Sequence, residues 1–389
     1  LRKTFKYISE NIGSFDNWFI LITKNDLREN INLVDNDNGD FNIFKDRSPS
    51  DNKKLYMIGM SNLNQDSNFN SDEDVINDIK LRYGPFTKTQ FLSSIQQFKV
   101  DLDYDRQINI FKQNATVLIG DQPVKINGNI NMINFQFNTP LHVVISGNSK
   151  NLLIYKCLFQ SQCKIYEDGT ITDLNNQNLY NIGSALSQAR VDSVIVSNCL
   201  FYNIFKGSSS SRIREDECSL GDVNTERTAA LQIVCSKADI FNNVFLNNDI
   251  GIVAVALQDT GFNNETHLNT TSISIKNCKI YNSKYDGLVA SFPGNINYVN
   301  KIINVDCSYT KEGNGFKVRN CILVKCKAVW NKYYGFILLN NKYLYKCHAI
   351  SNQTGILVTS TNQELFQLPY FKFNNHTTSL RDYDDSGNI

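Results

Sequence analysis

A short pattern that ends in glycine returns along the second half of the chain, and it constrains the fold more than any other feature. The pattern has Cys or Asn in its second place, then an apolar-rich run, and a glycine eight or nine residues after that place. Its glycines are Gly207, Gly251, Gly287, Gly315, Gly335 and Gly355. An internal repeat of about twenty residues, with longer insertions in the early turns, is typical of a solenoid.

The residues between these glycines favour strands. The segments VDSVIVSN, TSISIKN and LQIVCS alternate in polarity and are rich in β-branched residues. No amphipathic helix of useful length separates them, and the L-x-x-L-x-L frame of a leucine-rich repeat is missing. We therefore predict an all-β chain that forms a single right-handed parallel β-helix, with coils stacked about 4.8 Å apart.

We predict three parts in the 389-residue chain. Residues 1–105 form an N-terminal cap with the first coil or coils and a helical insertion, residues 106–365 form the β-helix, and residues 366–389 form a C-terminal tail or cap. A cap is expected because an open end coil presents unpaired strand edges. Residues 124–160 contain two coils by the same alternation. The chain begins at Leu1 rather than Met, so we expect an upstream segment to be missing.

Charge and composition exclude several classes of function. A net charge of +1 and a pI near 7.6 argue against a broad nucleic-acid surface. No run of eighteen apolar residues occurs, so no membrane span is expected. The ten cysteines form no CxxC pair and the four histidines lie far apart, which argues against a zinc site of the usual spacing.

Cysteine recurs at fixed places in the repeat. We expect Cys307, Cys326 and Cys347 to occupy one equivalent position, and Cys199 and Cys278 to do the same. Such a column can consist of buried thiols that act as small apolar side chains. Neighbouring coils are also close enough for a disulfide between rungs, so both interpretations stay open.

The residues after each glycine form two columns. The first contains Ile252, Leu288, Phe316, Phe336 and Ile356, and the second contains Val253, Val289, Lys317, Ile337 and Leu357. Successive side chains of a strand point to opposite faces, so we expect the first column to face the core and the second to face outward. An exposed apolar stripe usually marks an interface, so we expect self-association or a protein partner over the second column.

Lys317 would then be the one charged residue in an outward aliphatic column. One interpretation is a general base, because apolar surroundings lower the pKa of a lysine. The other is a lysine that extends to water from the edge of a covered stripe. The spacing of residues leaves both open.

The stretch EGNGFKVRN, followed by CKAVWNKYYGF and CHAISNQTGI, resembles the pectate lyases of polysaccharide lyase family nine over about residues 242–360. The resemblance implies a pectin-lyase-like β-helix that is secreted and acts on an acidic polysaccharide. In that family the lysine of the motif removes the proton next to the carboxylate of a uronate, and the glycosidic bond breaks by β-elimination. By motif match, Lys317 would be this base.

The family also holds a calcium ion with aspartates, which binds the uronate carboxylate. The resemblance implies that Asp286 is a ligand, with a polar turn residue as the alternative, and Asp249 and Asp306 are further candidates. Tyr285 and Val289 stand where the family has other aspartates. These departures predict weak calcium binding and argue against retained catalysis.

Further residues are candidates for contact with a sugar polymer. Arg319 replaces a motif glycine, and Arg212 and Arg214 lie in a polar segment after Gly207; an arginine can form paired hydrogen bonds with a carboxylate. A solvated loop is the alternative for Arg212 and Arg214. Tyr334 lies near a turn and can stack on a sugar or pack between rungs.

Two classes of function follow. The first is a secreted, pectate-lyase-like protein directed at acidic polysaccharide. The second is a non-catalytic β-helix that serves as a structural or adhesive subunit. The eroded aspartates and the apolar column favour the second class, whereas the NGFK motif favours the first, because nothing in the fold requires a lysine there.

Overall fold

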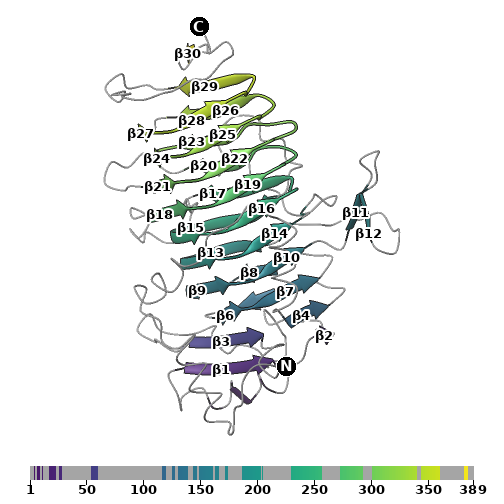
Figure 1. The fold of residues 1–389 in the computed structure, drawn as a ribbon. Coiled ribbons are helices and arrows are strands. Elements are labelled where there is room, and N and C mark those ends of the chain that lie inside the picture. Colours follow the sequence, from purple (N-terminus) through teal and green to yellow (C-terminus); the bar gives the residue numbers. More distant parts are fainter. Residues whose placement is uncertain are drawn as a thin grey trace, which may run out of the picture.

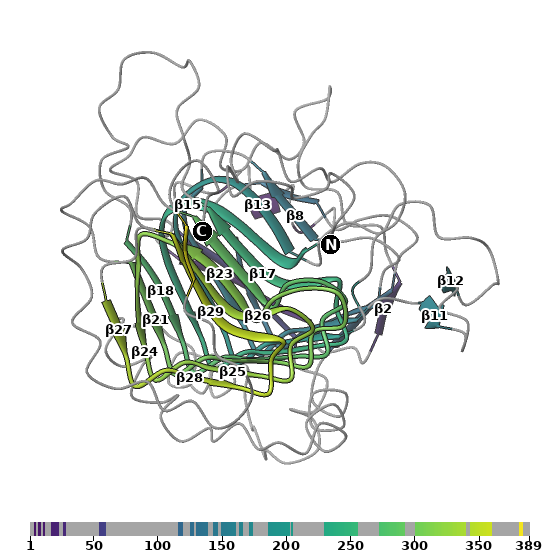
Figure 2. The ribbon, with the colours of Figure 1, turned by 90° about the horizontal axis from the view of Figure 1, so that it is seen from above.

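The computed structural model of the chain is a right-handed parallel β-helix whose strands stack coil upon coil (Figure 1). The structure describes residues 4, 7–8, 11, 17–22, 26–28, 54–59, 116–119, 125–127, 130–138, 143–146, 149–160, 163–165, 171–173, 186–202, 204, 229–255, 272–291, 300–339, 343–359 and 381–383. Viewed along the stack, three faces enclose one core (Figure 2).

We name these faces A, B and C. Face A contains β5 (Lys125–Asn127), β8 (Val143–Ser146), the first parts of β13 (Leu186–Ser197) and β15 (Ala229–Phe241), β17 (Ile250–Val255), β20 (Leu288–Ser291), β23 (Phe316–Arg319), β26 (Tyr334–Leu339), β29 (Thr354–Thr359) and β30 (Arg381–Tyr383). Face B contains β1 (Asn17–Ile22), β3 (Lys54–Gly59), β6 (Ile130–Ile133), β9 (Ser149–Tyr155), the second parts of β13 and β15, β18 (Ser272–Lys276), β21 (Asn300–Ile303), β24 (Cys321–Val324) and β27 (Tyr343–Tyr345). Face C contains β2 (Asp26–Arg28), β4 (Thr116–Ile119), β7 (Phe135–Asn138), β10 (Leu158–Gln160), β14 (Leu200–Tyr202), β16 (Val244–Leu246), β19 (Lys279–Tyr281), β22 (Asp306–Ser308), β25 (Lys327–Val329) and β28 (His348–Ile350).

All neighbours within these faces pair in parallel. Faces A and B form one 18-stranded sheet, because β13 and β15 run through both, whereas face C is a separate 10-stranded sheet. The short strands β11 (Cys163–Ile165) and β12 (Ile171–Asp173) pair with each other in antiparallel fashion. The all-β prediction and the two coils expected in residues 124–160 are confirmed.

The described strands extend into both predicted end regions. β1 pairs with β3 before the first complete coil, and β30 pairs with β29 inside the predicted tail. The expected helical insertion lies outside the described residues, as do the residues from 205 to 228. No described helix is long and apolar enough to cross a membrane.

The repeat glycines are needed because neighbouring coils approach closely, and not because of an unusual backbone angle. A Cβ atom on Gly251, Gly287, Gly315 or Gly335 would lie 2.7 Å from the carbonyl oxygen of the next glycine in the column. It would also meet a face C side chain, such as the Cβ of Ala328 at 3.1 Å from Gly315. Any larger residue would force these coils apart.

The phenylalanines of the core lie on face C in the earlier coils and on face A in the later ones. On face C, Phe137, Phe159, Phe201 and Phe245 stack with ring centroids 4.7, 4.7 and 4.6 Å apart. The same column continues as Ile280, Cys307, Ala328 and Ala349. On face A, the column runs Ile252, Leu288, Phe316 and Phe336, and the last two rings stack at 4.7 Å. Face A therefore supplies the volume that face C loses, which keeps the core filled.

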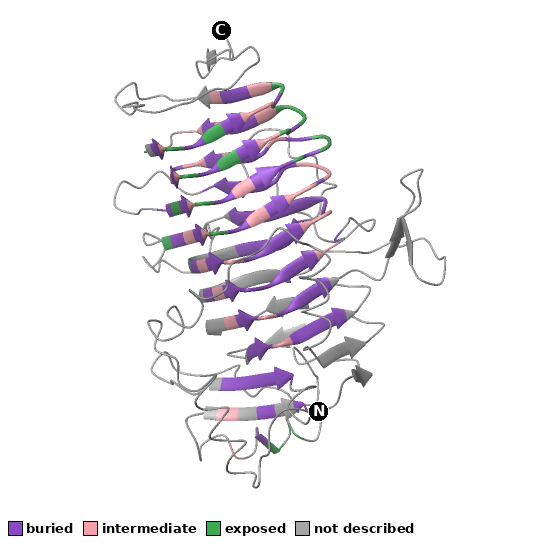
Figure 3. Cartoon of the chain, in the orientation of Figure 1, coloured by how far each residue is buried: buried purple, intermediate pink, exposed green. Residues whose placement is uncertain are grey.

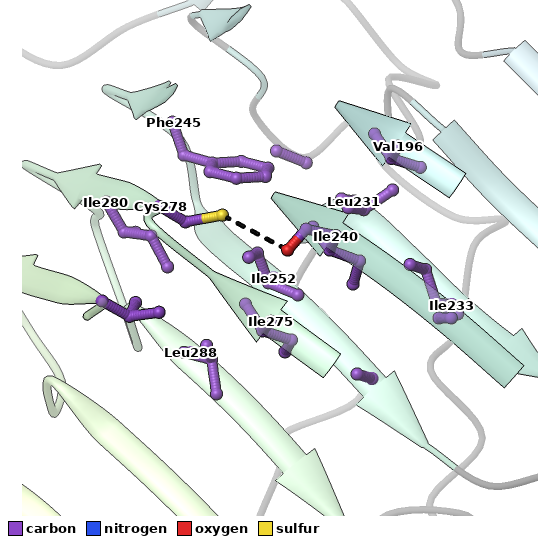
Figure 4. Close-up of a cluster of buried hydrophobic side chains, with 14 of the residues drawn as sticks. Val196, Leu231, Ile233, Ile240, Phe245, Ile252, Ile275, Cys278, Ile280 and Leu288 are labelled. Atoms are coloured by element: carbon purple, nitrogen blue, oxygen red, sulfur yellow. Dashed lines mark hydrogen bonds between the residues drawn. The ribbon is translucent and has the colours of Figure 1, made fainter. Parts of the chain in front are cut away.

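The seven cysteines whose side chains the structure describes are buried free thiols. Figure 4 shows Cys278 among apolar side chains, with its Sγ donating a weak hydrogen bond to the carbonyl of Ile240 at 3.9 Å. Burial raises the pKa of Cys278 to about 12. The equivalence expected for Cys307 is wrong, because β22 aligns Cys307 with Ala328 and places Val305 opposite Cys326. Matching cysteine to cysteine had shifted that coil by two residues.

Among the described residues, left-handed backbone recurs at two corners of the stack. At the corner between faces B and C, one residue per coil has φ between 51° and 63°: Asn134, Lys156, Asn198, Asn242, Asn277, Asn304, Lys325 and Lys346. After face C a second column does the same: Asn247, Asn282, Tyr309, Trp330 and Ser351. Asparagine tolerates this conformation, which explains much of its recurrence.

Buried asparagines join coils beside the second column. Asn352 Oδ1 accepts hydrogen bonds from the backbone N–H of Asn331 at 2.8 Å and from its Nδ2 at 2.9 Å. Asn352 Nδ2 donates to the carbonyl of Ala328 at 3.0 Å. These bonds form an asparagine ladder that joins successive coils at this corner.

Candidate functional site

Lys317 projects outward from the middle of face A. β23 alternates in burial, with Phe316 and Val318 buried and Lys317 and Arg319 half-buried. In the parallel ladder, Lys317 lies between Val289 of the preceding coil and Ile337 of the next. Both columns predicted after the glycines therefore have the expected direction, and the strand carries two outward cations on one face.

The second column is not an open apolar stripe over its whole length. Val253 and Val289 are only 1% and 2% exposed, whereas Ile337 and Leu357 are half-buried. The expectation of an exposed interface there is wrong for the two valines. Alternation fixes the direction of a side chain, but exposure also depends on what else in the chain lies over the face, and burying a valine is favourable.

Asp286 organises the turn that carries the NGFK motif. Its side chain is 3% exposed, and Oδ1 accepts hydrogen bonds from the backbone N–H of Asn314 at 2.9 Å and from its Nδ2 at 2.8 Å. A Cβ atom on Gly313 would lie 2.8 Å from the same oxygen. Asn314 Oδ1 in turn accepts the N–H of Tyr334 at 3.1 Å. Asp286 and Asn314 thus link three successive coils and fix the entry to β23.

The other two predicted calcium ligands have different surroundings. Asp249 is buried in the turn before β17, and its charge acts on Lys284. Burial opposes the charge of Lys284, but Tyr285, Asp249 and Glu312 together raise its pKa. Asp306 begins β22 on face C, where Oδ2 accepts the hydroxyl of Tyr281 at 2.8 Å and Oδ1 accepts the hydroxyl of Ser308.

The described aspartates do not form the set that calcium needs. Within the part of the chain that the structure describes, no three His, Cys, Asp or Glu side chains gather where they could hold a metal ion. Calcium takes six to eight oxygen ligands, whereas Asp286 and Asp306 already accept hydrogen bonds from their own coils. The described oxygen donors therefore do not fit a calcium ion.

The remaining predicted contacts divide between face A and undescribed residues. Arg319 stands two residues after Lys317 on the same outward face, and Tyr334 is half-buried at the start of β26. Arg212 and Arg214 lie outside the described residues. The three described side chains are therefore the Lys317 and Arg319 pair on β23 and one tyrosine on the next rung.

Exposed aromatic residues occupy the turns that lead into these strands. Tyr309 is 53% exposed with φ 63°, and Trp330 is 60% exposed with φ 57°, on successive rungs of the second left-handed column. Tyr333 is also exposed, in the turn before β26. Bulky side chains rarely adopt left-handed backbone, and here they gain little burial. Tyr309 was not predicted from the sequence, because its equivalence to Trp330 follows only from the pairing of β22 with β25.

A basic groove lies at the corner between faces B and C, which we call the B/C corner. It has a volume of about 690 Å³ and is lined by residues of five coils, including Lys279, Lys325, Lys327, Lys346 and His348. Figure 3 shows exposed positions along this part of the stack. These residues are not among those predicted from the sequence. Their signal is the KCK and KCH pattern, in which basic residue types flank Cys326 and Cys347.

No protein-family model, no curated protein and no solved structure matches this chain.

Proposed function

We propose that face A binds an acidic polysaccharide and that Lys317 contacts the reacting uronate. The observation that carries this proposal is the place of Lys317, outward on β23 between two aliphatic rungs with Arg319 on the same face. Residues two apart on a strand lie roughly 6.6 Å apart. This spacing suits two cations that contact one sugar or two neighbouring sugars of a polymer.

The exposed aromatic residues support the same proposal. Tyr309 and Trp330 follow face C on adjacent rungs, and their turns lead directly into β23 and β26. Aromatic rings offer an apolar body with a polar tip and commonly serve at recognition surfaces. Residues with costly backbone conformations cluster at functional sites in proteins. The ring of Trp330 is therefore a stacking surface for sugar in this proposal.

The proposed chemistry is β-elimination, as in the resembled family. As a neutral amine, Lys317 accepts the proton bonded to the carbon next to the carboxylate. The freed electron pair forms a carbon–carbon double bond, and the glycosidic oxygen leaves with the electrons of its broken bond and takes a proton from water. Arg319 forms hydrogen bonds to the carboxylate and stabilises the negative charge that develops on it.

The test is the ultraviolet absorbance of unsaturated uronate product from polygalacturonate and other uronans, with added calcium and with chelator. The Lys317→Ile variant suits the fold, because Val289 and Ile337 flank that position, and it should yield no product. The matched control is Lys301→Ile on face B, which removes the same charge from an exposed strand residue and should retain activity.

The outcomes separate catalysis from binding. Product from wild type that disappears only in Lys317→Ile supports the lyase. Polymer binding that weakens in Lys317→Ile without any product supports a non-catalytic binding face. If the protein forms no product from any uronan and binds none of them, the proposal is overturned. The structural or adhesive subunit is then the better account.

A further inference from the structure

The lysines of the B/C corner lie in two columns that run along the stack. The left-handed position contributes Lys325 and Lys346 on successive coils. The first position of face C contributes Lys279, Asp306, Lys327 and His348, which the parallel ladder aligns in that order. Neighbouring members of a column are about 4.8 Å apart, because that is the spacing of paired strands. Cations therefore recur along the axis of the stack and not around one coil.

These side chains face solvent. Lys325, Lys327, Lys346 and His348 are exposed, and none of Lys325, Lys327 and His348 forms an ion pair with another described residue. The carboxylate of Asp306 is held by Tyr281 and Ser308 of its own sheet. Four lysines against one aspartate give the groove a positive potential, although the whole chain has a net charge of only +1.

The groove continues into a column of amides. Asn242, Asn277 and Asn304 occupy the left-handed position in the coils before Lys325, and Asn304 Nδ2 donates to Asn277 Oδ1 at 2.9 Å. An amide offers both a donor and an acceptor, which matches the hydroxyl groups of a sugar. Cations match carboxylate or sulfate groups. One groove thus presents both kinds of partner in a line.

We infer that the B/C corner is a second binding site, separate from face A, for a linear anionic polysaccharide that lies along the axis of the stack. The volume of about 690 Å³ lies within the range of ligand sites, and the lining residues come from five successive coils, which suits an extended polymer. This inference rests on the residues of the corner and does not depend on activity at Lys317. Nucleic acid is disfavoured, because no aromatic side chain lines the described groove for bases to stack on.

The test measures binding of polygalacturonate and of dextran sulfate by calorimetry over a series of salt concentrations, with neutral dextran and oligo(dT) for comparison. The test variant is Lys325→Asn, Lys346→Asn and Lys327→Gln combined. Asparagine is the residue that other coils use at the left-handed position, so the variant should fold. Its affinity should fall about tenfold, and the dependence on salt should become shallower, since three exposed ion pairs are lost.

The control variant is Lys237→Gln and Lys301→Gln combined, which removes two exposed lysines of face B that belong to neither proposed site, so that the loss of affinity is compared per lysine removed. It should bind as the wild type does. Unchanged affinity in the corner variant, an equal loss in the control, or equal binding of neutral dextran would each overturn the inference. Tighter binding of oligo(dT) at the same lysines would overturn the assignment to polysaccharide. Because Lys317→Ile leaves the corner intact, the two proposed sites can fail independently.

Discussion

At the scale of single residues, cysteine serves in this core as a small apolar side chain. Cys199, Cys278, Cys326 and Cys347 lie at the same point of their coils, just after the left-handed residue, and Val305 takes the same place in another coil. Burial raises the pKa of Cys199, Cys278 and Cys326. Each of these three thiols therefore resists ionisation while the protein is folded.

This has a measurable consequence for stability at high pH. The pKa of Cys278 is about 12 in the folded protein against 9.0 for a free thiol, so its contribution is fully present below pH 9.0 and is lost as pH rises toward 12. The free energy of unfolding of wild type should fall relative to Cys278→Val by up to about 1.4 kcal/mol per pH unit in that window. Urea unfolding at several pH values measures the difference. Parallel curves for the two proteins would contradict this.

At the scale of the turn, the two left-handed columns have different tolerances. The B/C corner holds only Asn and Lys among the described coils, whereas the column after face C also holds Tyr309 and Trp330. Asn247 and Asn282 show that asparagine fits the second column. The aromatic residues therefore cost stability that the same backbone does not require.

We expect Trp330→Asn to raise the free energy of unfolding by about 1 kcal/mol, because asparagine tolerates the left-handed backbone. The same variant should weaken binding of acidic polysaccharide, since the stacking surface is lost. Thermal unfolding and calorimetry measure the two effects. Trp330→Phe keeps both the ring and the strain, so it should resemble wild type in each. A destabilised Trp330→Asn would show that the ring has a structural role.

At the scale of the whole molecule, each coil contacts mainly its two neighbours, and the registers of the three faces keep the stack continuous. Along the stack, phenylalanine is replaced by smaller residues in the core column of face C and appears in the core column of face A. The side-chain volume inside the stack is balanced in this way. Nearest-neighbour stability of this kind predicts that a coil can be removed if the register is preserved.

Deletion of the 20 residues 318–337 joins Lys317 to Leu338 and keeps the alternation of β23. This variant should unfold cooperatively at a moderately lower temperature, with the circular dichroism of a β-protein. Deletion of the 19 residues 318–336 joins Lys317 to Ile337, so each later residue of that strand turns to the opposite side. It should be insoluble or lack a cooperative transition. Equal behaviour of the two deletions would argue against a strict register.

The repeat and the alternation of inward and outward side chains can be predicted from the sequence, because both arise from the local spacing of residues. The glycine column, the inward column of Phe316 and the outward direction of Lys317 are all correct. The spacing of residues does not predict which outward side chains are buried. It also does not predict the register of strands that are joined by turns of unequal length. Val253 and Val289 are buried although they stand in the outward column. Cys307 was matched to Cys326, whereas the ladder pairs it with Ala328, and the turn from Ser308 to Gly315 is one residue longer than its equivalent from Val329. The lysines of the basic groove align in columns only in the register that the structure shows, so the sequence alone did not reveal the groove.

The B/C corner keeps one length while the corner between faces A and B does not. In each coil from β15 to β28, three residue steps separate the last ladder residue of face B from the first of face C, as from Val324 to Lys327. Between faces A and B, residues 256–271 lie in one coil and Asn320 alone in another. In evolutionary terms, insertions can accumulate at the A/B corner without changing the spacing of the lysine columns. The two corners can therefore diverge at separate rates, and descendants of this chain can gain new loops while inheriting an unaltered charged groove.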